Sequence, residues 1–192
     1  MKIVSIFESL PLIRKTGLRV LETFSCMKKE ELLRCAKKIS YPAILKIQTK
    51  EIAEKKEKGL VIILQNEVEF ISQVSTIKEI MKKKFAKVKK YSLVIQKKGE
   101  GEQAIFSMKR HNSFGPVLEI YYKNAIMHSI FPLSDEDCLT LVAFLESEKQ
   151  SEKISSFLKS CEQISFDKTI ISFSFSTFVS SMEIFQGEVA VD

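Results

Sequence analysis

Two histidines and four cysteines are the residues of this chain whose side chains most readily support metal or redox chemistry. Structural zinc sites and redox-active dithiols require closely spaced ligand pairs. The sequence has no C-x-x-C pair and no metal-ligand spacing among Cys26, Cys35, Cys138, Cys161, His111 and His128. We therefore expect no metal and no cofactor. The pattern predicts buried thiols in a reducing cytoplasm, and it leaves a Cys26–Cys35 bridge open as an alternative.

Patterns typical of catalysis are also missing from the sequence. None of the six glycines belongs to a glycine-rich loop that would surround phosphate groups. Two histidines on different predicted strands do not specify a Ser/His/Asp arrangement. The paired carboxylates of Asp135 and Asp137 are better explained as the acidic first turn of a helix. We therefore expect a protein that is not an enzyme.

A lysine-rich amphipathic helix is predicted to begin at Thr76. Thr76 and Glu79 have the spacing of a capping box, in which each side chain bonds a free backbone amide. One face is apolar (Ile77, Ile80, Met81, Phe85 and Val88), and the other carries Lys78, Lys82, Lys83, Lys84, Lys87, Lys89 and Lys90. A face that only aids solubility usually mixes charges of both signs. The pattern therefore favours an anion-binding surface, with an ordinary solvated face as the alternative.

Four short segments after this helix alternate between apolar and polar residues, which is typical of strands. They are Tyr91 to Lys98, Gln103 to His111, Pro116 to Tyr122 and Ala125 to Phe131. Turn residues at hairpin spacing separate them and predict an antiparallel meander. A further helix is predicted to begin at Ser134. The expected fold class is α+β, an antiparallel meander sheet with helices packed on one face and a basic, partly aromatic face left open.

The chain is predicted to divide into three ranges. Residues 1–75 form an N-terminal α/β region that packs on the core, 76–148 hold the basic helix and the ββββα unit, and 149–192 add a helical extension and a Phe/Ser strand with an acidic end. That strand, Thr169 to Val179, is uncharged and must be paired. We therefore expect a homo-oligomer through the C-terminal helix or strand. No segment has membrane-spanning length, so we expect a cytoplasmic protein without a membrane partner.

Positive charge is concentrated in the middle of the chain. The net charge is +6, yet Lys78 to Lys123 contain 12 Lys and Arg against 4 Asp and Glu. From Asp135 to the end there are 4 Lys against 11 acidic residues. A basic zone raises the local concentration of anions and favours polyphosphate backbones.

The order of elements from Tyr91 to Glu148 resembles small folds that bind single-stranded DNA. These are the positive cofactor four type of coactivator, the Whirly proteins and the ThermoDBP group. The shared feature is four meander strands followed by the Pro-Leu-Ser-Asp-Glu-Asp start of a helix, over about 58 of 192 residues. The resemblance implies binding with little sequence specificity and dimerisation through helices. The contacts it implies are Lys98, Lys109, Tyr121 and Lys123 on the sheet, with Lys97, Arg110 and Phe114 at its rim.

These observations together predict a non-catalytic nucleic-acid-binding protein that prefers single-stranded DNA, with RNA as a second ligand. The expected phosphate contacts on the helix are Lys82, Lys83, Lys87 and Lys90, which join the sheet residues above. The alternative is a protein-interaction or scaffolding module, such as a longin- or roadblock-like adaptor, that binds no nucleic acid. The sequence does not specify the biological process or the role of residues 1–75.

Overall fold

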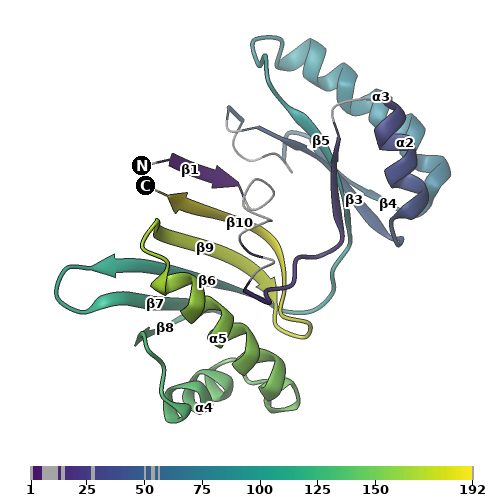
Figure 1. Ribbon diagram of the computed structural model, residues 1–192. Helices are drawn as coiled ribbons and strands as arrows, with labels where there is room; N and C mark the ends of the chain where they lie inside the picture. The colour runs from purple at the N-terminus through teal and green to yellow at the C-terminus, as the bar shows by residue number, and fades with distance from the viewer. Residues whose placement is uncertain are drawn as a thin grey trace. The chain divides into compact units, whose positions relative to one another are not determined.

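The computed structural model describes residues 2–5, 13, 16–26, 29–49, 51–52, 55 and 57–191. They form two units, each with its own antiparallel sheet (Figure 1). Unit 1 joins Met1–Val20 to Gly99–Asp192, and unit 2 is Leu21–Lys98. The chain is therefore α+β with antiparallel sheets, and the predicted fold class is confirmed. The units cut across the ranges 1–75, 76–148 and 149–192, and that division into domains stays a prediction.

Unit 2 contains a four-stranded sheet and two helices. The strands are β2 (Thr23–Cys26), β3 (Ala43–Gln48), β4 (Val61–Leu64) and β5 (Ser92–Lys97), in the order β2-β5-β3-β4. The helices are α2 (Lys29–Lys38) and α3 (Glu67–Lys84). Alternation along β3 sends Ala43, Leu45 and Ile47 into one core with both helices, and it places Lys46 on the opposite face.

The lysine-rich helix begins earlier than the sequence predicts. Its N-cap is Asn66, whose side chain accepts a hydrogen bond from the Glu69 amide at 3.1 Å. Thr76 lies inside the helix, where its hydroxyl donates to the Ser72 carbonyl oxygen. Apolar residues near the true start, such as Val68, are exposed, so the apolar residues there do not follow the helical period of the buried face. The helix also ends at Lys84, so the later lysines do not belong to it.

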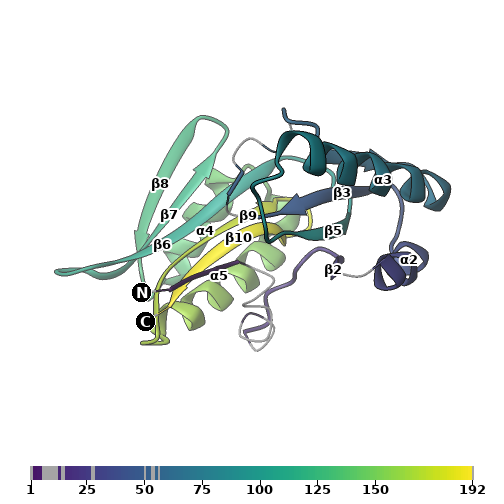
Figure 2. The ribbon, with the colours of Figure 1, turned by 90° about the horizontal axis from the view of Figure 1, so that it is seen from above.

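Unit 1 contains a six-stranded antiparallel sheet in the order β1-β10-β9-β6-β7-β8. Its strands are β1 (Lys2–Ser5), β6 (Gln103–His111), β7 (Gly115–Tyr122), β8 (Ala125–Ile130), β9 (Ile170–Phe178) and β10 (Glu183–Val191). Two helices, α4 (Asp135–Phe144) and α5 (Ser151–Phe166), lie on one face of this sheet (Figures 1 and 2), and the short 3-10 helix η1 (Glu148–Gln150) connects them. Phe106 and Phe157 meet in the core with ring centroids 4.8 Å apart.

The predicted four-strand meander is split between the two units. Strand β5 pairs with β2 and β3 in unit 2, whereas β6, β7 and β8 form a three-strand meander in unit 1. The other neighbour of β6 is β9, which lies far along the chain. The ββββα unit behind the single-stranded-DNA resemblance is therefore absent from the described fold, because the turn residues after β5 lead into another sheet.

The C-terminal elements are used inside unit 1. Strand β9 pairs with β10 on one edge and with β6 on the other, so both of its edges are occupied. Helix α5 buries Ile154, Phe157 and Leu158 in the core. Strand β9 therefore has no free edge for a second copy, and the predicted homo-oligomer through the C-terminal helix stays a prediction. Within the described ranges, no helix is long and apolar enough to cross a membrane.

Candidate functional site

The sheet of unit 2 carries a chain of hydrogen bonds on the face opposite its helices, which we call the Lys46 face. Lys46 Nζ donates to Gln96 Oε1 at 2.8 Å, and Gln96 Nε2 donates to Thr23 Oγ1 at 2.7 Å. The hydroxyl of Thr23 donates in turn to the Leu21 carbonyl oxygen at 2.6 Å. Because strand register places Gln96 opposite Thr23, and its side chain is 1% exposed, the Gln96 amide holds the lysine in one position.

The charge of a second lysine, Lys55, affects the protonation of the Lys46 ammonium group. Burial and, to a smaller extent, the positive charge of Lys55 together lower the pKa of Lys46 to about 8. Lys55 belongs to the β3–β4 connection, where its carbonyl oxygen accepts a hydrogen bond from the Leu60 amide at 2.9 Å. An anion bound between the two lysines would offset both effects. The Lys46 face therefore has the charge of a phosphate-binding site.

Gln48 adds a hydrogen-bond acceptor to this face. It lies two residues after Lys46 on β3, so its side chain projects to the same side of the sheet. Its Oε1 atom is buried and has no hydrogen-bond partner in the part of the chain that the structure describes. An unsatisfied buried acceptor costs about 1–3 kcal/mol. A ligand that brings a hydroxyl or amino donor would remove this cost.

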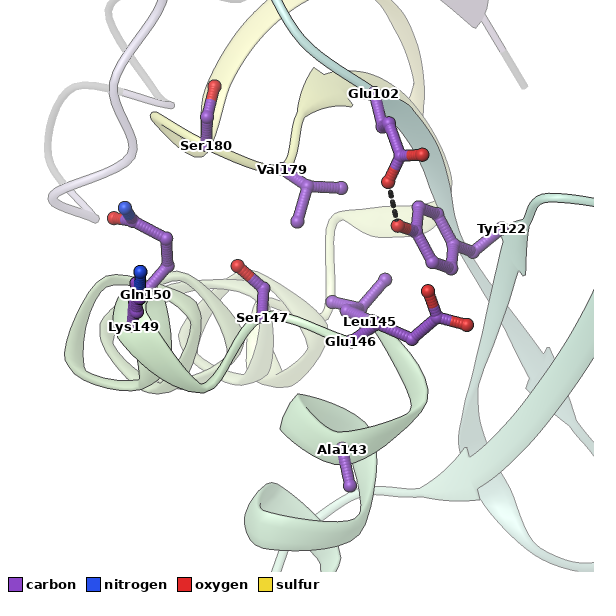
Figure 3. Close-up of a pocket in the computed structure, with 10 residues that line it drawn as sticks. All are labelled: Glu102, Tyr122, Ala143, Leu145, Glu146, Ser147, Lys149, Gln150, Val179 and Ser180. Carbon is purple, nitrogen blue, oxygen red and sulfur yellow. Dashed lines mark hydrogen bonds between the residues drawn. The ribbon is translucent and has the colours of Figure 1, made fainter.

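Unit 1 has a separate polar pocket of about 610 Å³ beside Tyr122 (Figure 3). The Tyr122 hydroxyl donates to Glu102, and Lys123 Nζ pairs with Glu102 at 3.5 Å and with Glu146. The bond to Glu146 raises the pKa of Lys123, and the bond from Tyr122 lowers the pKa of Glu102. Two carboxylates pair with this lysine, and the pocket lining holds Glu102 and Glu146 against Lys149, so it has no excess of positive charge for a phosphate.

The predicted contact residues lie in both units, and none of them takes part in the hydrogen-bond chain of Lys46, Gln96 and Thr23. Unit 2 contains Lys82, Lys83, Lys87, Lys90, Lys97 and Lys98, and unit 1 contains Lys109, Arg110, Phe114, Tyr121 and Lys123. All are exposed except Lys98, which is half-buried. Their part in binding any ligand stays a prediction.

Several of these residues, Lys123 among them, have structural partners. The Arg110 guanidinium donates to the carbonyl oxygens of Ser165, Asp167 and Ile170, which satisfies backbone groups in and after the last turn of α5. Phe114 stacks on His111 with ring centroids 4.9 Å apart.

Sequence reasoning did not single out Lys46. The available signal was one lysine within the apolar strand Ala43–Gln48, at a position where alternation directs the side chain away from the helices. Gln96, its partner, is 50 residues away in sequence. No periodicity links two residues at that separation.

The described residues do not fit a protein metal centre. They contain no group of three His, Cys, Asp or Glu side chains that could hold a metal ion. A Mg²⁺ ion bound together with a nucleotide usually takes most of its ligands from phosphate oxygens and water, with one or two protein carboxylates. The polar groups that the Lys46 face offers to a ligand are therefore ammonium and amide groups.

The family of this chain follows from a direct match. The family model for the ATP-grasp domain matches residues 2–120, which is more than half of the sequence. This range includes Lys46, Lys55 and Gln96. The chain belongs to the ATP-grasp family.

A curated relative and two solved structures extend this result. The chain is 28% identical over 172 residues to 4-hydroxybutyrate–CoA ligase (ADP-forming) of Nitrosopumilus maritimus (strain SCM1), covering 82% of this chain and 24% of that protein. It therefore spans about a quarter of that relative.

The structural likeness covers nearly the whole chain. A dinucleotide-forming acetyl-coenzyme A synthetase 1 of Ca. Korarchaeum cryptofilum, solved with coenzyme A, superposes with a TM-score of 0.82 at 18% identity, covering 100% of this chain and 94% of that one. PH1788 of Pyrococcus horikoshii Ot3 gives 0.80 at 17% identity, with 99% and 92% covered. Likeness at these identities shows the fold.

These matches correct the sequence-based function. Membership of the ATP-grasp family contradicts the resemblance to single-stranded-DNA-binding folds and the expected nucleic-acid partner. The expectation that the protein is not an enzyme is also wrong, because the family and the matched ligase are ATP-dependent. The error has a physical origin. Lysine-rich surfaces attract any polyphosphate, and charge alone does not distinguish a nucleotide from a nucleic-acid backbone.

Proposed function

We propose that this chain is the nucleotide-binding domain of an ADP-forming acid–CoA ligase. The ATP-grasp match and the relative of that activity support the reaction class. The single structural observation that carries the proposal is Lys46, held by Gln96 and adjacent to Lys55, on the Lys46 face. One cation on strand β3 and a second on the β3–β4 connection suit the phosphates of ATP and ADP.

Each residue of the site has a separate role in this proposal. The Lys46 ammonium donates to a phosphate oxygen, and Gln96 keeps it in place before the ligand arrives. Lys55 adds a second positive charge for a polyphosphate. The Gln48 acceptor takes a hydrogen bond from a donor on the nucleotide, since phosphate oxygens themselves supply none.

The proposed ligase activity also requires binding sites for the acid and for CoA. The chain spans 24% of the curated ligase, and we assign the binding of both substrates to polypeptide beyond this domain. We place the domain in the cytoplasm. Cys138 and Cys161 are free, buried thiols, which is usual in a reducing compartment, and burial raises the pKa of both.

Isothermal titration calorimetry with ATP, ADP and a single-stranded oligonucleotide tests the proposal. We expect saturable binding of both nucleotides, with and without Mg²⁺, and no saturable binding of the oligonucleotide at physiological salt. AMP should bind more weakly, because it lacks the phosphates that both lysines would contact. A folded chain that binds neither ATP nor ADP at millimolar concentration would overturn the proposal.

Nucleotide binding should also take up protons near pH 8. The pKa of Lys46 in the free protein is about 8, so the amine is partly neutral there, and a bound phosphate raises this pKa. Affinity should therefore fall as the pH rises above 8, and proton uptake should vanish below pH 7, where Lys46 is already charged. Titrations in two buffers with different ionisation enthalpies measure the uptake. Equal apparent enthalpies in both buffers at pH 8.3 would contradict this role of Lys46.

A further inference from the structure

Strand β8 forms an outer edge of the sheet in unit 1. It pairs with β7 on one side, and no strand among the described residues pairs with its other side (Figure 2). Edge strands of soluble proteins usually carry a charged residue, a proline or a bulge that blocks further pairing. The segment Ala125–Ile130 contains no Lys, Arg, Asp, Glu or Pro, and its register with β7 is regular. This edge is therefore competent to pair.

Hairpin geometry shows which backbone groups face the free edge. Lys123 and Asn124 both have positive φ and form a two-residue turn, so Tyr122 and Ala125 are its hydrogen-bonded closing pair. Hydrogen-bonded and non-bonded pairs alternate along an antiparallel ladder. Ile126, His128 and Ile130 therefore direct their N–H and C=O groups away from β7.

The side chains of the same three residues share one face of the sheet. Alternation places them opposite the face covered by α4 and α5, and the two isoleucines are 54% and 47% exposed. His128 lies between them with its Nδ1 atom 3.7 Å from Glu119 Oε1 on β7. The free edge thus combines unpaired backbone groups with two exposed β-branched side chains.

We propose that two copies of this chain associate through β8, antiparallel and with the two-fold axis at His128. The two six-stranded sheets then form one continuous sheet. This pairing rests on β8 alone, so it is independent of the proposed nucleotide site.

The sequence of β8 is complementary to itself in this register. Centring the axis on His128 places Ile126 opposite Ile130 of the second copy, and Ile130 opposite Ile126 of the second copy. Both pairs lie on the same face, since all the residues involved have the same parity. The three residues that offer backbone groups to the edge become the hydrogen-bonded pairs of the new ladder.

A second copy suits this edge better than an unrelated strand for a physical reason. In an isologous contact every favourable off-axis pair occurs twice, and here both pairs between residues 126 and 130 join two isoleucines. No like charges meet, because the segment has no Lys, Arg, Asp or Glu, and each His128 brings its own Glu119. The contact involves one short strand from each copy, so the dimer should be weak and reversible.

Sedimentation velocity of the full chain at increasing concentration tests the proposal. We expect a monomer–dimer equilibrium in the wild type and a monomer for two edge variants. His128→Pro removes an N–H that points away from β7, and Ile130→Lys places a charge within the new ladder. Ile105→Lys is the matched control, because Ile105 is 40% exposed on the same face but lies on the inner strand β6. This control should remain dimeric.

Disulfide trapping tests the register. His128→Cys places two thiols together at the axis and should give a cross-linked dimer under mild oxidation. Ile126→Cys places them on opposite sides of the axis and should add no cross-link beyond that of the wild type. Three results would overturn the proposal: a wild-type chain that is monomeric at every concentration, a dimer that persists in both edge variants, or cross-linking at residue 126 in place of 128.

Discussion

The Lys46→Met variant should bind ATP and ADP about 10- to 100-fold more weakly than the wild type. A hydrogen bond from a charged donor contributes about 1.5–3 kcal/mol, and 1.4 kcal/mol corresponds to a factor of ten in affinity. Methionine has a similar length but no donor and no charge, so the substitution removes the proposed phosphate contact together with the hydrogen bond to Gln96. Calorimetric titration of both nucleotides measures the change.

The Lys46→Met variant should lose little thermal stability, although its affinity for nucleotides falls. Burial disfavours the Lys46 ammonium in the free protein, and methionine removes that cost. Against this gain, Gln96 Oε1 loses the hydrogen bond from Lys46. The two effects oppose each other, so the thermal midpoint should change little while binding falls steeply. Lys109→Met, an exposed change on the sheet of unit 1, is the control and should alter neither property. Unchanged affinity in Lys46→Met would remove Lys46 from the site.

Local signals in the sequence predicted several elements of unit 1, although not the strands β1 and β10. The predicted range Gln103 to His111 matches β6, and the acidic start of α4 is a true capping box, in which Ser134 and Asp137 bond each other's backbone amides. The turn at Lys123 and Asn124 also forms as expected. These features depend on neighbouring residues, whose chemistry is visible in a single sequence.

Contacts between distant segments were not predictable in the same way. The pairing of β6 with β9 and the place of β5 in the other sheet depend on which strands meet, and alternation is the same in either arrangement. The candidate site also depends on contacts between segments that are distant in the sequence. Lys46 becomes notable only when Gln96 and Lys55 lie near it, and the sequence gives no measure of that proximity.

Truncation of a buried phenylalanine should destabilise the unit that contains it by about 3–5 kcal/mol. Phe106 is fully buried in unit 1 and contacts Phe157 of α5, whereas Phe70 of α3 is 1% exposed in unit 2. The two residues belong to separate hydrophobic clusters. Because a domain is stable by only about 5–15 kcal/mol, either loss is a large share of the total.

Hydrogen exchange measured by mass spectrometry can assign each loss to its unit. Phe106→Ala should speed amide exchange in peptides from residues 99–191, and Phe70→Ala should do so in peptides from 21–98. Each variant serves as the control for the other, since both remove the same side chain from a buried position. Equal acceleration of both regions by either variant would contradict two separate cores. If each variant accelerates exchange only in its own unit, then Lys46 and Gln96, the residues of the proposed nucleotide site, depend for their stability on the Phe70 cluster of unit 2.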